Sequence, residues 1–400
     1  MKNGLWLLTG NMVYAISQWL ILVVLSKFFT KDELGSYFFA LAIVAPLALL
    51  FSLKLPNLVV VLEESLVGQK SIFFCRFLLS LILIFCSYII YFLFFNENTN
   101  ISILISVLIY KILEQNDDVI AAYFQKCFLF KNIFILKLWR SIIYLIFIFL
   151  CCLLFNNIEN ILIISTFGYS VFWILRNRRF IQFSSLSKEK KYLIHYFKSG
   201  YYLALSSSIS SLSVSGVRLY IGYVLGNSVL AIYGVISYTL TIFSIVVAAL
   251  GQYFLPLFVK DKNNFKKFKY HLVKSQIFML FIGLLCVLIS FFAGDFLLGL
   301  FYGSDYGSYG LYLCLIFIAN IFKSSSALMG TAVTAKNIYN FQLKFTIISL
   351  ILTLILVPIF VLKFNILGAF LALVAVAFFE WLLYIFFFKQ LMRDFIDENL

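Results

Sequence analysis

Long, continuous apolar runs fill this chain almost from end to end, and no other feature constrains its fold as strongly. Hydrophobic residues make up 63% of the 400 positions, charged residues make up only 12%, and the mean hydropathy is +1.03. A soluble domain of this size does not carry such a composition. One helix that crosses a bilayer needs about 20 apolar residues. The sequence therefore predicts an all-α polytopic membrane protein.

The apolar runs between polar breaks predict about twelve transmembrane helices. They do not alternate apolar and polar residues, as the strands of a membrane barrel do. No small-residue cleavage site follows the first run, so that run is expected to be a helix rather than a cleaved signal. The expected spans are Gly4–Phe28, Gly35–Val61, Ile72–Phe95, Ile101–Phe124, Ile133–Phe155, Ile158–Ile174, Ser199–Val224, Ser228–Val259, Leu272–Ala293, Gly307–Ala335, Phe341–Leu362 and Leu367–Phe388.

The basic residues predict how these spans are oriented. Lys and Arg outnumber Asp and Glu by 31 to 17, and most of them lie at run ends that share one side. Only Lys27, Lys31 and Lys363 lie at the opposite ends. This is the positive-inside pattern, which predicts a multi-pass protein of the cytoplasmic (inner) membrane with both termini in the cytoplasm. The basic clusters after the sixth and eighth spans are interpreted as contacts to anionic lipid, and no nucleic-acid partner is expected.

Two short motifs recur about half a chain apart. Leu34–Tyr37 and Leu230–Tyr233 open the second and eighth spans, and Lys131–Phe134 and Lys336–Tyr339 precede the fifth and eleventh. Six spans separate equivalent points, so the repeats run parallel across the membrane. The sequence thus predicts two parallel-repeat six-helix bundles, at 1–180 and 198–400, joined by a basic cytoplasmic linker at 181–197.

Four basic side chains lie deep within apolar runs: Lys54, Lys111, Arg218 and Lys323. A charge at bilayer depth costs about 2.5–3.5 kcal/mol on insertion scales and persists only beside a partner or a water-filled cavity. At 1.5 Å per residue, the four cations fall at successive depths of the bilayer. They are the candidate contacts for an anionic substrate, and Glu380 in the last span is a lone acid that could balance one of them.

The fourth span carries the most polar helix face. Lys111, Glu114, Gln115 and Asp118 recur at steps of three and four, which places them on one stripe, and Asp117 lies beside it. Glu114 and Asp118 are four residues apart, so their charges repel unless one is protonated or a cation from another helix neutralises it. Two interpretations stay open: an internal salt-bridge network that locks helices together, and a site that faces substrate or couples protons.

Catalytic chemistry finds no support in the sequence. The chain has no nucleophile elbow, no P-loop and no metal-ligand spacing, and its seven cysteines lie mostly within apolar runs. We therefore expect no enzyme activity, no metal and no cofactor, while coupling to H⁺ or Na⁺ is left open.

Several segments resemble the polysaccharide flippases of the Wzx type, within the MATE-like MOP exporter superfamily, and the resemblance covers nearly the whole chain. Leu34–Ile43 is similar to the family's Gly-x-Tyr opening of the second helix, and Leu225–Tyr233 is its counterpart. Leu300–Tyr306 resembles the loop before the tenth helix, and Leu367–Ala372 resembles the start of the last helix.

The resemblance implies that the chain moves an undecaprenyl-pyrophosphate-linked oligosaccharide from the inner to the outer leaflet by alternating access. It implies a role in the assembly of a surface glycan (O-antigen of lipopolysaccharide, capsule or exopolysaccharide), beside other glycan-assembly membrane proteins. The chain departs from the family at two places. Val217 precedes Arg218 where an acid is frequent, and Lys54 begins the stretch where the family often has Asp-x-Gly.

Rival functions remain at this point. A multidrug or ion-coupled exporter of the same superfamily would favour acidic cavities, which four intramembrane cations argue against. A membrane glycan polymerase or ligase would need a sizeable outer loop with catalytic side chains, whereas the predicted outer loops are short. A structural scaffold of a glycan-assembly complex would tolerate changes of single charges.

Overall fold

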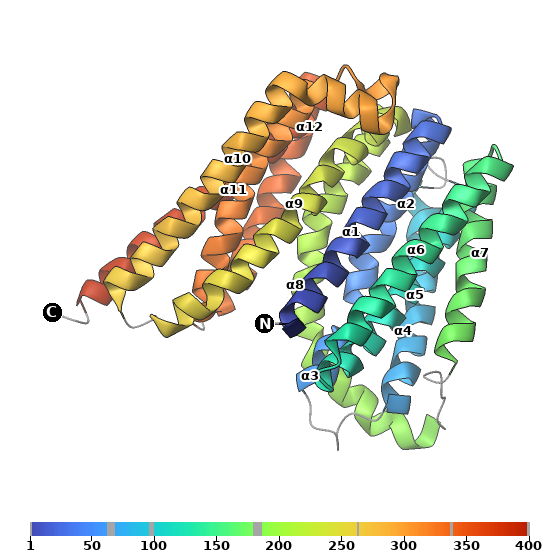
Figure 1. The fold of residues 1–400 in the computed structure, drawn as a ribbon, viewed down its shortest axis with the longest axis horizontal. Helices are drawn as coiled ribbons and strands as arrows, with labels where there is room; N and C mark the ends of the chain where they lie inside the picture. The colour runs from blue at the N-terminus through green and yellow to red at the C-terminus, as the bar shows by residue number, and fades with distance from the viewer. Residues whose placement is uncertain are drawn as a thin grey trace. The chain divides into compact units, whose positions relative to one another are not determined.

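The computed structural model describes residues 2–61, 69–95, 100–178, 186–261, 264–336 and 339–397, and within these ranges all regular structure is helical (Figure 1). The elements are α1 (Lys2–Phe28), α2 (Lys31–Leu50), α3 (Leu55–Val61), α4 (Gln69–Ile90) with a π-helical turn at Tyr91–Phe95, α5 (Ile101–Lys126), α6 (Phe130–Leu154), α7 (Ile158–Asn177), α8 (Leu186–Leu225), α9 (Asn227–Lys260), α10 (Phe265–Tyr302), a 3₁₀ turn at Ser304–Tyr306, α11 (Gly310–Ala335) and α12 (Tyr339–Asp397).

Eight candidate membrane spans are long and apolar enough by length and composition among the described residues. They are Leu5–Phe28, Lys31–Val60, Ser71–Phe94, Phe130–Leu154, Ile158–Asn177, Lys266–Tyr302, Gly310–Ala335 and Lys344–Phe388. The helices α5, α8 and α9 are also long, and α12 contains two helices joined at a kink. With α2 and α3 taken together, the described helices correspond to the predicted spans in number and order, which confirms the predicted all-α fold.

The second span is not the single helix that the sequence predicted. It consists of α2 and α3, separated by a turn at residues 51–54. Pro56 explains the break, because it has no N–H for the Ser52 carbonyl and its ring would clash with that carbonyl. The Ser52 carbonyl instead accepts a 3.0 Å hydrogen bond from Leu55 N. Leu53 and Lys54 adopt left-handed backbone angles within the turn, with φ of 45° and 49°.

The last two predicted spans follow each other in α12 across a kink. Asn365 has non-helical backbone angles there, with φ 51° and ψ −133°. The two halves of α12 come so close that a Cβ on Gly368 would lie 2.0 Å from the carbonyl oxygen of Phe360. Glycine is therefore required where the second half of α12 begins.

Contacts between Cα atoms divide the chain into two compact units, Met1–Ala231 and Ile232–Leu400. In the first unit α1 packs on α6, α2 packs on α8, and α5 contacts α2, α3 and α7. In the second unit α11 packs against α10 and α12. The helix α8 begins at Leu186, inside the predicted linker, part of which (181–185) lies outside the described residues. The arrangement as two six-helix bundles stays a prediction.

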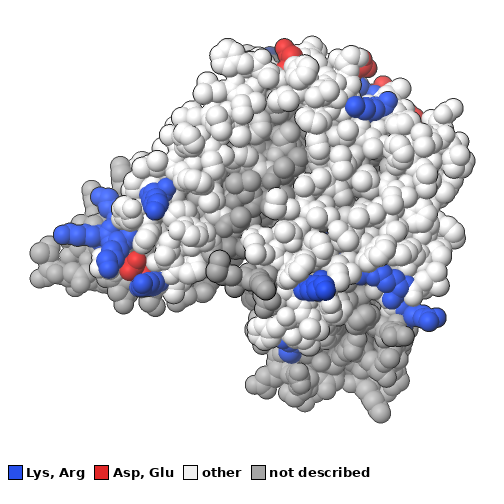
Figure 2. Space-filling view, in the orientation of Figure 1, with Lys and Arg blue, Asp and Glu red and all other residues white. Residues whose placement is uncertain are grey.

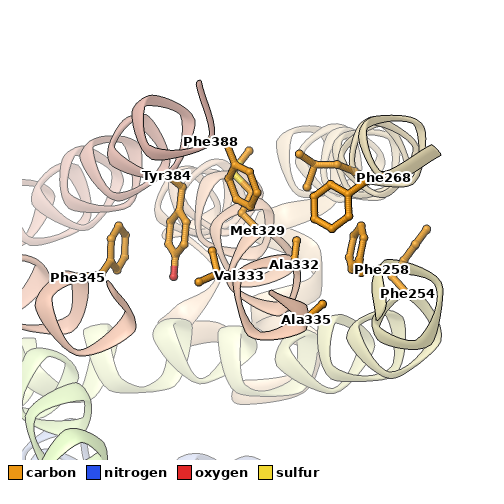
Figure 3. Close-up of a cluster of buried hydrophobic side chains, with 11 residues drawn as sticks. Phe254, Phe258, Phe268, Met329, Ala332, Val333, Ala335, Phe345, Tyr384 and Phe388 are labelled. Carbon is orange, nitrogen blue, oxygen red and sulfur yellow. The ribbon is translucent and has the colours of Figure 1, made fainter. Parts of the chain in front are cut away.

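Aromatic side chains build much of the core of the second unit (Figure 3). Helix α9 contributes Phe254 and Phe258, which stack with ring centroids 6.0 Å apart. Phe258 also contacts Phe268 of α10, and Phe345 lies 4.0 Å from the ring of Tyr384 within α12. Small residues of α11, including Ala332, lie between these rings in the close-up. The cluster joins four helices of this unit by burying large apolar surfaces.

Charged side chains lie mainly toward the ends of the helices on the face shown in Figure 2, and uncharged side chains fill the length between them. Many large apolar residues are exposed along the helices, among them Phe85, Leu154, Phe281 and Phe292 at 65%, 74%, 67% and 81% of their surface. A soluble protein would bury such a continuous apolar surface. These exposed side chains fit a lipid environment.

The Leu34–Tyr37 motif lies at a close contact between helices of the first unit. Thr30 and Glu33 form a capping box that starts α2. One turn later, Gly35 meets the backbone at the junction of α8 and α9, where a Cβ would lie 1.9 Å from the Asn227 carbonyl oxygen. Asn227 Nδ2 also donates a 3.1 Å hydrogen bond to Ser36 Oγ.

We expect Gly35→Ala to lower the free energy of unfolding by about 1–3 kcal/mol, because a methyl group overpacks this contact against backbone that cannot rotate away. Thermal unfolding of the purified protein in detergent measures the change. Gly216→Ala in α8 is the matched control, since a Cβ there meets no atom within 4 Å, and it should be neutral or slightly stabilising. Equal unfolding temperatures for the two variants would contradict the prediction.

Candidate functional site

The charged residues of α5 lie in a polar network inside the first unit. Lys111 Nζ donates to Glu114 Oε2 at 2.7 Å, within the same helix. Tyr14 of α1 donates its hydroxyl to the same carboxylate. Lys111 and Glu114 are 25% and 12% exposed in their side chains. Lys111 and Glu114, which the sequence places on one helical stripe, therefore form an ion pair, with a third partner from another helix.

Arg140 of α6 is a buried cation that contacts Asp118 and the backbone at Glu114. It is 2% exposed, and its Nη1 lies 3.3 Å from both Asp118 Oδ1 and the Glu114 carbonyl oxygen. Its guanidinium carbon stands 4.2 Å from the centre of the Tyr14 ring. Of the two solutions that the sequence left open, neutralisation by a cation from another helix is the one present here.

Asp117 points away from this stripe and into the contact with α7. It is fully buried and accepts hydrogen bonds from Trp173 Nε1 at 2.7 Å, Tyr169 Oη at 3.3 Å and Asn177 Nδ2 at 3.5 Å. Three hydrogen-bond donors of α7 satisfy the Asp117 carboxylate. No cation among the described residues forms an ion pair with it. Asp117 thus fastens α5 to α7.

Trp173→Phe should lower the free energy of unfolding by about 1.5–3 kcal/mol, because it removes the shortest donor to a buried carboxylate and leaves the ring volume largely filled. Thermal unfolding in detergent measures this. Trp139→Phe in α6 serves as the control, since that indole is 44% exposed. A loss no larger for Trp173→Phe than for Trp139→Phe would rule out the stabilising role of this hydrogen bond.

Arg76 of α4 is a second buried cation that the sequence analysis did not single out. It is 1% exposed. Its Nη1 donates to the Phe51 carbonyl oxygen at 2.9 Å, and its Nη2 donates to the side-chain oxygen of Gln115. Gln115 in turn donates to the Ala48 carbonyl oxygen. The polar stripe of α5 therefore reaches the break between α2 and α3.

A cavity of about 330 Å³ opens beside this network, between α1, α3, α5 and α6. Its polar lining is Asn57, Asp118, Gln125 and Lys137, and its apolar lining includes Leu7. Lys137 also hydrogen-bonds the side chain of Asn11. The acidic stripe is thus accessible at one point, Asp118, whose side chain is 44% exposed.

The four predicted substrate contacts lie in different surroundings. Lys54 is half-buried at the break between α2 and α3, and Lys111 is paired with Glu114. Arg218 of α8 is half-buried, with its guanidinium carbon 5.7 Å from the ring centre of Phe38. Lys323 is exposed halfway along α11, in the second unit. The described residues contain no ion pair of Lys54 or Lys323.

Glu380 of α12 has a neutral partner in the described structure. It accepts a hydrogen bond from Ser349 Oγ, also in α12, across the kink. The serines that follow Lys323 are buried: Ser325 hydrogen-bonds Gln276 of α10, and Ser324 bonds back to Asn320. These serines support helix packing.

Comparison with known proteins places this architecture in a family. The sequence profile of the polysaccharide biosynthesis protein family matches residues 1–262. The chain belongs to this family. The capsular polysaccharide biosynthesis protein CapF of Staphylococcus aureus is 26% identical over 402 residues, which cover 98% of this chain and 99% of CapF. The predicted resemblance to Wzx-type proteins is confirmed.

Solved structures confirm the MATE-like fold. The lipid II flippase MurJ, in an inward closed conformation, matches with a TM-score of 0.73 at 18% identity, over 95% of this chain and 86% of MurJ. An inward-facing multidrug resistance MATE family transporter of the MOP superfamily matches with a TM-score of 0.62 at 13% identity, over 100% and 96% of the two chains. Both solved structures are of transporters, and what this chain shares with them is the fold.

Proposed function

We propose that the protein is a flippase that moves undecaprenyl-pyrophosphate-linked oligosaccharide repeat units from the cytoplasmic to the outer leaflet of the inner membrane by alternating access. Membership of the polysaccharide biosynthesis family and the fold shared with a lipid II flippase support a lipid-linked glycan as the substrate. Both termini lie in the cytoplasm in this proposal, as the basic residues predict.

The observation that carries the proposal is the position of Lys323. It is exposed at the middle of an apolar helix and has no ion pair within the described residues. A lysine at the centre of a span lies too far from either interface to reach it easily with its side chain. Such a cation is tolerated where it faces an aqueous route or an anion. A diphosphate headgroup is an anion that gains strongly from a cation in surroundings of low dielectric constant.

Lys54, Arg218 and Lys323 are the proposed headgroup contacts, and neither Lys54 nor Lys323 has an ion pair among the described residues. Lys111 belongs to the same set, but an incoming anion would have to compete there with Glu114 at 2.7 Å. Glu114, Asp117, Asp118 and Glu380 are the proposed charge-balancing or ion-coupling groups. The cation contacts of Glu114 and Asp118 favour charge balance for these two. The described donors to Asp117 and Glu380 are neutral side chains.

Deletion of the gene in its own host tests the function. Lipid-linked glycan intermediates are then measured by mass spectrometry, and surface glycan is measured on whole cells. Accumulation of single undecaprenyl-pyrophosphate-linked repeat units, together with loss of surface glycan, is the expected result. Unchanged glycan lipids with increased drug sensitivity would instead favour a multidrug exporter, and repeat units that reach the surface without polymerising would contradict flipping.

A further inference from the structure

We propose that Arg76 and Gln115 form a clamp that positions Lys54 for the diphosphate headgroup, and that this clamp helps to set the affinity for the headgroup. The inference rests on the proposed function, because it takes Lys54 as a headgroup contact. Arg76 and Gln115 are positioning residues in this proposal and do not touch the substrate.

The backbone that carries Lys54 is unfavourable on its own. Leu53 and Lys54 are two consecutive residues with a Cβ at φ of 45° and 49°, in the left-handed region that side chains other than glycine rarely adopt. Ser52 Oγ accepts a 3.2 Å hydrogen bond from Lys54 N, which supports the turn locally. A strained turn of this kind persists only where its surroundings hold it.

The clamp supplies that support through the main-chain carbonyl groups that the break leaves without helical partners. Arg76 donates to the Phe51 carbonyl oxygen at 2.9 Å, and Gln115 donates to the Ala48 carbonyl oxygen. The two side chains also bond each other, since Arg76 Nη2 donates to Gln115 Oε1. One connected unit therefore joins α4 and α5 to the end of α2, immediately before Lys54.

Helix α8 closes the other side of the turn. A Cβ on Gly200 would lie 2.1 Å from the Leu53 carbonyl oxygen, so the glycine allows α8 to pack directly against the strained residue. Ser208 Oγ donates to the Pro46 carbonyl oxygen at 3.0 Å, which fixes α8 along α2. The turn is held between the clamp and α8, and Lys54 remains half-buried with no ion pair among the described residues.

The surroundings of Arg76 argue for this role over simple charge neutralisation. The guanidinium is 1% exposed, and the described structure contains no ion pair of Arg76. A buried charge without an ion pair is costly. The hydrogen bonds it makes to other elements go to the break and to the glutamine that also supports the break. An uncharged residue would pack there more easily if the break needed no support.

The test measures binding of undecaprenyl pyrophosphate to the purified full-length protein in detergent micelles. Lys54→Met and Gln115→Met are each expected to weaken binding about tenfold, the effect of losing one charge-assisted contact. The double variant is expected to bind no more than about twofold more weakly than Lys54→Met alone, because both changes remove the same contact. The extent to which an amine-acetylating reagent modifies Lys54, measured by mass spectrometry, should differ between Gln115→Met and the unchanged protein. The extent for Lys363 should be the same in both.

Two further variants keep the inference falsifiable if Gln115→Met fails to fold. Arg76→Lys retains the charge but reaches only one of the two acceptors, so it should weaken binding by an intermediate factor. Gln276→Met is the matched control, because Gln276 likewise joins two helices by hydrogen bonds to Ser325, and it should leave binding unchanged. If Lys54→Met weakens binding and the double variant loses affinity by the product of the two single fold-changes, the clamp is overturned but the headgroup contact is not. Unchanged binding by Lys54→Met would overturn the headgroup contact as well.

Discussion

Arg140→Met is expected to lower the free energy of unfolding by about 1.5–3 kcal/mol, because it removes the buried guanidinium that donates to Asp118 and to the Glu114 carbonyl oxygen. Arg140 touches Asp118, the Glu114 carbonyl oxygen and the Tyr14 ring at once, and it is 2% exposed. Methionine fills a similar volume but carries no charge. Thermal unfolding in detergent and the amount of folded protein in membranes measure the loss.

The controls for this prediction separate charge from volume. Arg178→Met changes an exposed arginine beyond the end of α7 and should shift the unfolding temperature little. Arg140→Lys keeps the charge but loses the planar fork, so an intermediate loss is expected. Adding Asp118→Asn to Arg140→Met should restore part of the stability, because it removes the carboxylate that lost its cation. Full stability of Arg140→Met would show that the carboxylates do not depend on this cation.

The buried cations show how much of this network could be predicted from the sequence. Helical spacing predicted one polar stripe, on which Glu114 and Asp118 repel unless one is protonated or a cation from another helix neutralises it. It could not say which of the many basic residues supplies that cation, because the contact joins α5 to α6 and depends on how the two helices pack. The predicted spans did hold a signal. Arg76 and Arg140 both lie inside predicted apolar runs, where a basic residue needs a partner or a water-filled cavity.

Asp117 illustrates a different limit. Its place beside Asp118 suggested a group of acids with a shared role, and the spacing alone could not separate them. A helix turns by about 100° per residue, so neighbouring residues face different helices. Asp117 therefore meets Trp173 while Asp118 meets Arg140. Only the packing of α7 against α5 reveals this difference.

The second span shows the same limit for the backbone. The sequence predicted one span over Gly35–Val61, and α3 and most of α2 lie within it. The two left-handed residues could not be predicted, because the groups that hold them come from Arg76, Gln115 and Gly200, which are distant in sequence. Local propensity opposes this conformation, and tertiary contacts outweigh it.

Charge reversal at the proposed headgroup contacts should abolish export. Arg218→Glu and Lys323→Glu are each expected to reduce surface glycan at least about a hundredfold. Each change replaces attraction of the diphosphate by repulsion, and the interaction between close charges is worth several kcal/mol at low dielectric constant. Arg218 lies beside the Phe38 ring and is half-buried, so a carboxylate there would repel a diphosphate strongly. Surface glycan on whole cells and lipid-linked repeat units by mass spectrometry are the two measurements.

Conservative variants and a matched control decide whether charge is the cause. Arg218→Lys and Lys323→Arg keep the charge and should retain most of the export. Lys274→Glu reverses an exposed lysine that also stands over an aromatic ring, 5.9 Å from the centre of Tyr270, and it should leave surface glycan unchanged. Protein levels in the membrane must stay normal, so that loss of export cannot follow from misfolding. Full surface glycan in either reversed variant would remove that residue from the headgroup route, and full export in both would favour a structural role for the intramembrane charges.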